Sequence, residues 1–197
     1  MHPQPQTQPH PPRPHPEHAM NANPNDTREE LAAPSAYRQR LIGMVGDRAP
    51  LDVLAATPTQ LHAITRAHSA DALRRRPASS RWSPLEVIGH MLDVEWTVGW
   101  RIRTIYCDDH PTIMGMDQDR WVDTQRHQQR DPADIVDDFA ALRSINLKLW
   151  RTIPVDAMHR TGRHAERGEE SLALMLPLQA GHDLTHLAQI NRLLSTR

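Results

Sequence analysis

Three stretches of the sequence share one pattern that begins a helix: TPTQ at 57–60, SPLE at 83–86 and DPAD at 131–134. Each has a residue that can cap a helix, a proline at the first helical position, and a Gln, Glu or Asp at the third. The polar side chains satisfy backbone N–H groups that lack a partner in the first helical turn. The pattern therefore predicts three helix starts, with Thr57, Ser83 and Asp131 as the caps.

These starts and the apolar spacing after them predict four main helices: 58–68, 84–106, 132–152 and 171–195. For the first of them an extension toward the N-terminus is left open, and a short helical segment at 37–45 precedes it. In the third main helix, apolar residues recur at steps of three and four, which is typical of an amphipathic helix. Pro177 is expected to kink the last helix or to mark its true start. No alternating run rich in Val, Ile and Thr indicates a strand, so the chain is expected to be all-α.

The second and third main helices are joined by a long link, residues 107–131. A link of this length can carry the chain back along a bundle, so that the two helices it joins run parallel. The predicted fold is therefore an all-α four-helix bundle with a long crossover between helices 2 and 3.

The first 34 residues differ in composition from the rest of the chain. Pro, Gln, His and Asn dominate 1–34, and large apolar residues are nearly absent. Such a segment buries too little surface to offset its ordering entropy, which predicts a disordered leader. Residues 35–197 are expected to form one bundle domain.

Charge and cysteine content narrow the classes of partner. The formal net charge is −1, so no basic field favours nucleic acid as a partner. Cys107 is the single cysteine, which rules out an intrachain disulfide and suits a reducing compartment. There is no run of 18 apolar residues and no secretory signal, so we expect no membrane partner and a cytoplasmic location.

Two histidines stand one turn apart on the last predicted helix, in the stretch GHDLTHLAQI at 181–190. His182 and His186 lie about 40° apart on one face, with Cβ atoms about 6 Å apart, which is close enough to hold one ion. Leucine and isoleucine residues flank them, so both imidazoles are expected to face the bundle interior. The pair alone is also explained by two partly buried histidines bonded to neighbours, so a metal site needs a ligand from another helix.

His90 is the candidate for that ligand. The capping box at Ser83 fixes the phase of its helix and places His90 at the border between an apolar and a polar stripe, facing the interior. Packed helices lie about 8–10 Å apart, so imidazoles from two of them can meet at one ion. Three neutral imidazoles leave a fourth ligand position for water, hydroxide or a substrate thiolate, which is typical of a catalytic site.

Several other polar residues bear on this hypothesis. Glu86, Asp93 and Gln189 share the face or its edge and are candidates to orient an imidazole or a bound water. Asp183 is expected at the edge of the histidine stripe, and because it replaces the Glu of H-E-x-x-H, a zinc protease is not favoured. Four other histidines are expected in loops or at helix ends on the surface: His110, His127, His159 and His164.

The stretches RWSPLEVIGHMLDVEW at 81–96, TGRHAERGEESL at 161–172 and GHDLTHLAQI resemble the DinB/YfiT-like superfamily, in particular its DinB_2 type. The resemblance covers about residues 48–194. It implies a four-helix bundle that binds one divalent ion, nickel or zinc, through His90, His182 and His186, often as a homodimer. A further apolar strip on the second helix (Leu85, Ile88, Leu92, Trp96) fits either deeper burial or a dimer face.

Known relatives of this kind include thiol S-transferases, which join a small-molecule thiol to an electrophile, and others resemble metal hydrolases. Our first hypothesis is a metal-dependent S-transferase of detoxification type, in which the ion lowers the pKa of a bound thiol. A metal-dependent hydrolase is the nearest alternative, but no general base is evident in the sequence. A metal-stabilised bundle that acts as a stress-response binding protein without turnover is the third.

Overall fold

The computed structural model describes residues 34–165 and 167–195. The predicted disordered leader therefore lies outside the described residues, apart from Pro34, which begins the first helix. The helices have these bounds: α2 Pro34–Val45, α3 Pro50–Ala67, α4 Ala70–Arg74, α5 Pro84–Cys107, α6 Gln118–Thr124, α7 Pro132–Thr152 and α8 Leu172–Ser195, with short 3-10 turns η1 His127–Gln129 and η2 Val155–Ala157. Three short strands complete the fold: β1 Thr112–Ile113, β2 Thr161–His164 and β3 Gly168–Ser171.

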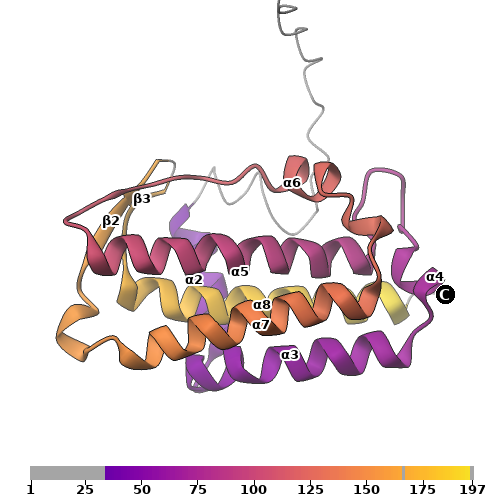
Figure 1. The fold of residues 1–197 in the computed structure, drawn as a ribbon, viewed down its shortest axis with the longest axis horizontal. Coiled ribbons are helices and arrows are strands. Elements are labelled where there is room, and N and C mark those ends of the chain that lie inside the picture. Colours follow the sequence, from indigo (N-terminus) through magenta and orange to yellow (C-terminus); the bar gives the residue numbers. More distant parts are fainter. Residues whose placement is uncertain (1–33, 166, 196–197) are drawn as a thin grey trace, which may run out of the picture.

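The long helices α3, α5, α7 and α8 form a four-helix bundle (Figure 1). Around the bundle, α3 contacts α7 and α8, and α5 contacts the same two helices. The chain from α5 returns along the bundle before α7 begins, so α5 and α7 run parallel (Figure 1). The predicted fold class and the predicted crossover are confirmed.

Two of the three predicted helix starts are confirmed. Ser83 and Glu86 form a reciprocal capping box at the start of α5. Asp131 accepts hydrogen bonds from the backbone N–H groups of Ala133 and Asp134 at the start of α7. Both helices begin at the predicted residues, Pro84 and Pro132.

The cap predicted at Thr57 is wrong, because α3 begins at Pro50 and Thr57 is fully buried inside it, so the alternative of an N-terminal extension is confirmed. Its hydroxyl donates to Asp183 of α8 over 2.7 Å, a long-range partner that no local pattern reveals. Pro58 has no N–H for the carbonyl of Leu54, four residues earlier. Arg143 of α7 donates to that carbonyl over 2.8 Å, so the helix tolerates the proline.

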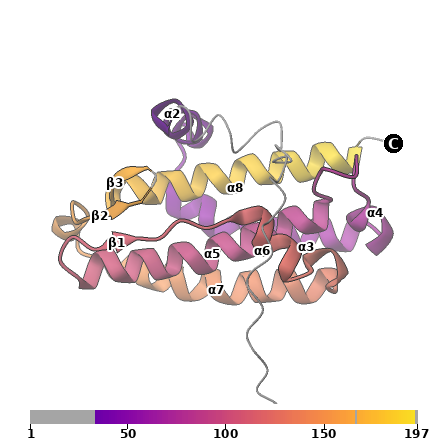
Figure 2. The ribbon, with the colours of Figure 1, turned by 90° about the horizontal axis from the view of Figure 1, so that it is seen from above.

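The three strands form a small sheet that the sequence did not predict. β1 pairs parallel with β2, and β2 pairs antiparallel with β3, at the end of the bundle where α8 begins (Figure 2). Strands of two to four residues are too short to show an alternating pattern. The sheet fastens the beginning of the crossover to the segment that precedes α8.

The bundle interior has two apolar clusters with a polar layer between them. One cluster includes Leu54, Ile102 and Trp150, and the other includes Leu61, Ile88 and Phe139. Between the two on each helix lie the buried polar residues of the layer: Thr57, Glu95, Arg143, Asn146 and Asp183. The core is therefore divided along its length.

The apolar strip on the second main helix, α5, is mostly buried within this chain, which agrees with the first of the two alternatives, deeper burial. Leu85 and Ile88 are fully buried in the second cluster and Leu92 is 8% exposed, whereas Trp96 is 57% exposed. Homodimer formation stays a prediction. Within the described part of the chain, none of the helices combines the length and apolar character needed to span a bilayer.

Candidate metal centre and its pocket

Three imidazoles from two antiparallel helices converge in the bundle. Nε2 of His182 lies 3.2 Å from Nε2 of His90 and 3.1 Å from Nε2 of His186. One ring nitrogen of each residue lies within 4.8 Å of those of the other two. α5 supplies His90 and α8 supplies the i, i+4 pair, so the sequence-predicted set is brought together.

The environment keeps two of these rings neutral. Burial, followed by the neighbouring imidazole of His186, lowers the pKa of His90 and of His182 well below the ordinary value. Within the described chain, the buried Nδ1 atoms of both rings have no hydrogen-bond partner. Neutral rings keep the lone pairs that a metal ligand needs.

Gln189 fixes the orientation of the third ring. Its side-chain Oε1 lies 2.8 Å from Nδ1 of His186, one turn along α8. Because an amide oxygen accepts, Nδ1 of His186 carries a proton in this contact, which leaves Nε2 as the nitrogen that faces the other two histidines. An acceptor on the far ring nitrogen is the usual support for a metal-ligating histidine.

The donor set fits a divalent transition-metal ion. Three imidazole nitrogens facing one point suit zinc or nickel, which bind nitrogen ligands well. A trio of acidic side chains would instead suit magnesium or calcium. Two of the three histidines, His90 and His182, also line a pocket, so a small molecule can reach the cluster.

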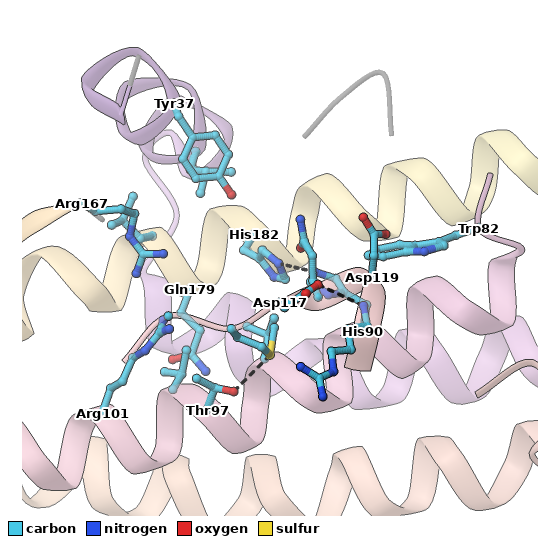
Figure 3. Close-up of a pocket in the computed structure, with 18 of the residues that line it drawn as sticks. Tyr37, Trp82, His90, Thr97, Arg101, Asp117, Asp119, Arg167, Gln179 and His182 are labelled. Carbon is cyan, nitrogen blue, oxygen red and sulfur yellow. Dashed lines mark hydrogen bonds between the residues drawn. The ribbon is translucent and has the colours of Figure 1, made fainter. Parts of the chain in front are cut away.

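The pocket has a volume of about 840 Å³ and lies between α5 and α8. One face of α5, from His90 to Arg101, and one face of α8, from Met175 to His182, supply two of its walls. The remaining walls come from α2, from the segment before α5, and from the crossover and the β2–β3 turn. Figure 3 shows His90 and His182 turned toward each other in this space.

Comparison with known proteins identifies the family. The family model of the DinB superfamily matches residues 54–190, which is more than half of the chain. The chain belongs to the DinB superfamily. The match spans all three histidines and all four helices of the bundle in part or in full.

Curated relatives of this DinB-superfamily chain carry one description. A Bacillus cereus (strain B4264) protein named "Putative metal-dependent hydrolase" is 24% identical over 115 residues, 57% of this chain and 64% of the relative. An Oceanobacillus iheyensis protein with that description is 27% identical over 116 residues, 58% of this chain and 66% of the relative. The chain thus spans just under two thirds of the length of these relatives.

A solved structure supports the fold. The YfiT protein of Bacillus subtilis, described as "a probable metal-dependent hydrolase with an unusual four-helix bundle topology", superposes with a TM-score of 0.69. The two are 21% identical, and the match covers 73% of this chain and 83% of YfiT. The DinB-superfamily chain therefore shares the bundle topology of YfiT.

Glu86 and Asp93, which we expected beside the imidazoles, have other partners in this DinB-superfamily chain. Glu86 accepts hydrogen bonds from Ser83 and Arg76 at the start of α5. Asp93 accepts from Gln125 over 2.7 Å and contacts Nε2 of His127 at 2.8 Å. Asp93 thus ties the crossover to α5, whereas the third candidate, Gln189, contacts the site histidine His186.

Two of the four histidines expected on the surface are buried, so that prediction is wrong for them. His127 is fully buried and its ring packs where a Cβ on Gly89 would lie, at 2.3 Å. His164, in β2, is 1% exposed. His110 and His159 are exposed, as expected. The sequence signal for the close approach of His127 was Gly89, a glycine inside the helix that the capping box at Ser83 begins.

Asp183 was expected at the edge of the stripe but is buried in the polar layer. Arg143 binds it over 2.6 Å and binds Glu95 over 2.7 Å. Burial opposes the charge on Arg143, but the two carboxylates outweigh it and raise its pKa further. The polar layer lies beside the three-histidine cluster, because Asp183 follows His182 directly.

Trp82 and Asp119 lie at one end of the pocket (Figure 3). The Trp82 ring centroid is 5.0 Å from that of His90. Burial, and then the nearby Asp117 and Asp123, raise the pKa of the Asp119 carboxyl. A carboxyl with a raised pKa in a cleft is a candidate proton acceptor or donor. Sequence reasoning missed Asp119, because its environment depends on how the crossover folds over α5.

Proposed function

We propose that this DinB-superfamily protein is a metal-dependent enzyme whose divalent ion, zinc or nickel, is held by His90, His182 and His186. The observation that carries the proposal is the convergence of three Nε2 atoms at the wall of a large pocket. Three protein ligands leave a coordination position for a molecule from the pocket, whereas a closed structural site supplies a fourth protein ligand.

The finer proposal is a thiol S-transferase. When bound, a zinc or nickel ion supplies a soft Lewis acid that lowers the pKa of a thiol. The reaction forms a bond between the thiol sulfur and an electrophilic carbon, whose leaving group departs with the electron pair of its bond. The thiol proton is released to water or to a pocket carboxylate. The histidines hold the ion, and the pocket walls orient the two organic molecules.

The size and lining of the pocket support group transfer between two organic molecules. Small-molecule sites span about 300–1,000 Å³, so a volume of about 840 Å³ leaves room for a thiol and an electrophile together. Val94, Val98, Met175 and Leu178 provide apolar surface beside the histidines. A thiol with an organic body gains binding energy from such a wall, whereas water does not.

Hydrolysis is the second candidate, and Asp119 is the observation that favours it. A hydrolase needs a general base near its water nucleophile. Asp119 is a candidate, because the pKa of its carboxyl is raised toward neutral pH. The names of the relatives agree with this reading. Replacement of Asp119 by Asn would then remove hydrolysis while leaving thiol transfer largely intact.

The test begins with metal content. Purified protein would be analysed for transition metals, stripped with a chelator, and reloaded with zinc or nickel. We expect about one ion per chain, lost in His90→Ala and retained in His159→Ala, whose histidine is exposed. Circular dichroism would confirm that both variants remain folded.

Activity is then measured with a panel of small thiols and a generic electrophile, and separately with ester and amide substrates. We expect conjugation that requires both the metal and His90. Metal-dependent cleavage without conjugation would replace the first candidate with the hydrolase. Bound metal without turnover in either assay would instead support a structural ion in a non-catalytic binding protein.

A further inference from the structure

Two columns of residues run from the three-histidine cluster along facing walls of the pocket. On α5, Val94 and Val98 follow the site histidine of that helix by four and eight residues. On α8, Leu178 and Met175 lie four and seven residues before His182. Such steps keep side chains on one face of a helix. Because α5 and α8 run in opposite directions (Figure 1), both columns leave the cluster toward the same end of the bundle.

A third helix adds to this apolar lining, because Leu41 of α2 also lines the pocket. The five side chains are called the apolar track below: Leu41, Val94, Val98, Met175 and Leu178. Leu41, Val98 and Met175 are no more than 7% exposed, whereas Val94 and Leu178 are half-buried. The track is therefore an interior surface, and apolar ligand atoms that cover it leave water, which is favourable.

Two polar residues beside the track, Thr97 and Gln179, are hydrogen-bonded within the protein. Thr97 donates to the sulfur of Met116 over 3.3 Å. The amide nitrogen of Gln179 donates to Glu95 over 2.8 Å, and its oxygen accepts from the indole of Trp150 over 3.1 Å. A ligand beside these two residues therefore gains free energy by burying apolar atoms and needs no polar group of its own there.

Charged residues that are bonded to one another mark the far end of the track. Arg167 binds Glu170 through two hydrogen bonds of 2.6 and 3.0 Å, and Arg38 donates to the backbone carbonyl of Arg167 over 2.7 Å. Figure 3 shows Arg101 and Arg167 at this end, with the site histidines between them and Trp82. Covering charged groups with apolar atoms costs free energy, so the surface that favours an apolar ligand ends here.

The spacing along α5 sets the length of the track. Val98 lies eight residues beyond His90, which is about 12 Å along a helix axis. An extended chain of eight carbons spans about 9 Å, because each C–C bond is about 1.5 Å long and the chain is a zigzag. An alkyl tail of about six to eight carbons therefore fits between the histidines and the charged end.

We propose that the apolar track binds the alkyl tail, about six to eight carbons long, of a substrate whose reactive end lies at the three histidines. The tail site stands on the pocket alone, whereas the reaction at the other end rests on the proposed function. The protein is therefore selective for long tails over short ones among compounds with the same reactive group.

Binding to the metal-free protein tests the tail site separately from catalysis. Isothermal titration calorimetry would compare butanol, hexanol, octanol and decanol, which differ only in chain length. We expect affinity to rise about three- to fourfold for each added methylene up to octanol, and decanol to bind no more tightly than octanol. Equal affinity for butanol and octanol, no measurable binding of octanol, or an unbroken rise to decanol would overturn the proposal.

Two variants assign the binding to the track. Val98→Phe fills its far part and should remove the gain of octanol over hexanol, whereas Leu178→Gln should weaken octanol binding about fivefold or more. Leu178 is only half-buried, so this variant serves if Val98→Phe fails to fold. Val155→Phe and Ile145→Gln, at positions 90% and 52% exposed, are the matched controls. Unchanged octanol binding in the folded track variants would place the alcohol elsewhere and reject this site.

The reacting end is tested on zinc-loaded protein in two series: butanethiol or hexanethiol with chloroacetamide, and mercaptoethanol with N-butyl or N-hexyl chloroacetamide. In each, a sulfur–carbon bond forms, chloride leaves with the electron pair of its bond, and the thiol proton passes to buffer.

Faster metal-dependent conjugation of the hexyl compound in one series, lost in Leu178→Gln, supports both proposals and identifies the molecule that carries the tail. Tail binding in calorimetry with no metal-dependent conjugation would reject the S-transferase and retain the track. Metal-dependent conjugation at equal rates for butyl and hexyl compounds in both series would retain the enzyme and reject the track as its substrate site.

Discussion

Gln189 determines which nitrogen of His186 faces the other two histidines, through its contact with Nδ1. Replacing it with Leu removes the acceptor at similar size, so the ring can rotate or change tautomer. We expect Gln189→Leu to lower metal affinity by about 10- to 100-fold, measured by competition with a chromogenic chelator.

Two matched variants separate this effect from general damage. Gln189→Glu keeps an acceptor and should retain most of the affinity, whereas Gln60→Leu, on the exposed face of α3, should leave it unchanged. Equal affinity in Gln189→Leu and the unmodified protein would show that packing alone orients His186.

His164 makes the stability of the fold depend on pH. Unfolded, its imidazole takes up a proton below about pH 6.5, but in the folded protein burial and the nearby arginines hold its pKa at about 4. The unfolded state binds this proton first, so the contribution of His164 to stability is full above pH 6.5 and falls as the pH drops to 4. The total loss is about 3 kcal/mol.

Replacing His164 with Gln, which does not titrate, should remove that part of the pH dependence. Urea unfolding at several pH values between 7 and 4.5 would show a shallower loss of unfolding free energy for His164→Gln than for the unmodified protein. His159→Gln, at an exposed position, should follow the unmodified curve. Parallel curves for all three proteins would contradict the prediction.

At the scale of the element, α2 depends on one glycine of α8. A Cβ on Gly181 would lie 2.1 Å from the backbone carbonyl oxygen of Leu41, so the two helices cannot keep their present distance with any larger residue. We expect Gly181→Ala to destabilise the protein by about 1–3 kcal/mol and to displace α2 from the pocket, as measured by thermal unfolding and by proteolysis within 34–45.

Gly43 of α2 is the matched control. A Cβ there would have no atom within 4 Å, and alanine favours a helix over glycine by about 0.5–1 kcal/mol. Gly43→Ala should therefore be neutral or stabilising. A similar loss of stability in both variants would show that the helix crossing is more tolerant than its geometry indicates.

The crossover is fixed to α5 at several points between β1 and η1. Thr97 donates to the sulfur of Met116, Arg101 to the carbonyl of Met114, and Asp93 binds the side chains of Gln125 and His127. These contacts place Asp119 at the pocket. Asp93, which we expected to support the metal, instead positions the crossover beside the pocket.

At the scale of the whole molecule, the polar layer joins the four helices of the bundle through hydrogen bonds and ion pairs. Arg143 of α7 lies between Glu95 of α5 and Asp183 of α8, and also supports the Leu54 carbonyl that Pro58 leaves open in α3. One buried side chain therefore connects all four helices.

Replacing Arg143 with Met would leave two buried carboxylates without a cation. We expect a loss of about 3–5 kcal/mol in the free energy of unfolding, because removing one partner of a buried ion pair leaves the other charge buried without compensation. Urea unfolding would measure it, with Arg151→Met as the exposed control, expected within about 0.5 kcal/mol of the unmodified protein. A small effect for Arg143→Met would show that water reaches the layer.

The sequence by itself determined the features that depend on neighbours along one helix. The caps at Ser83 and Asp131, the amphipathic helices they begin, and the His182–His186 pair all follow from helical spacing. The crossover length implied parallel helices, and the capping box set the phase that turns His90 inward. These features were predictable because helix geometry is regular over short distances.

Only the tertiary structure decided the partners of buried polar groups. Thr57 caps no helix because Asp183 accepts its hydroxyl from another helix. Asp93 and Glu86 point away from the imidazoles because the crossover and Arg76 bind them. The small sheet arises where segments far apart in sequence meet. A buried polar group must find a partner, and which partner lies within reach is set by packing between helices.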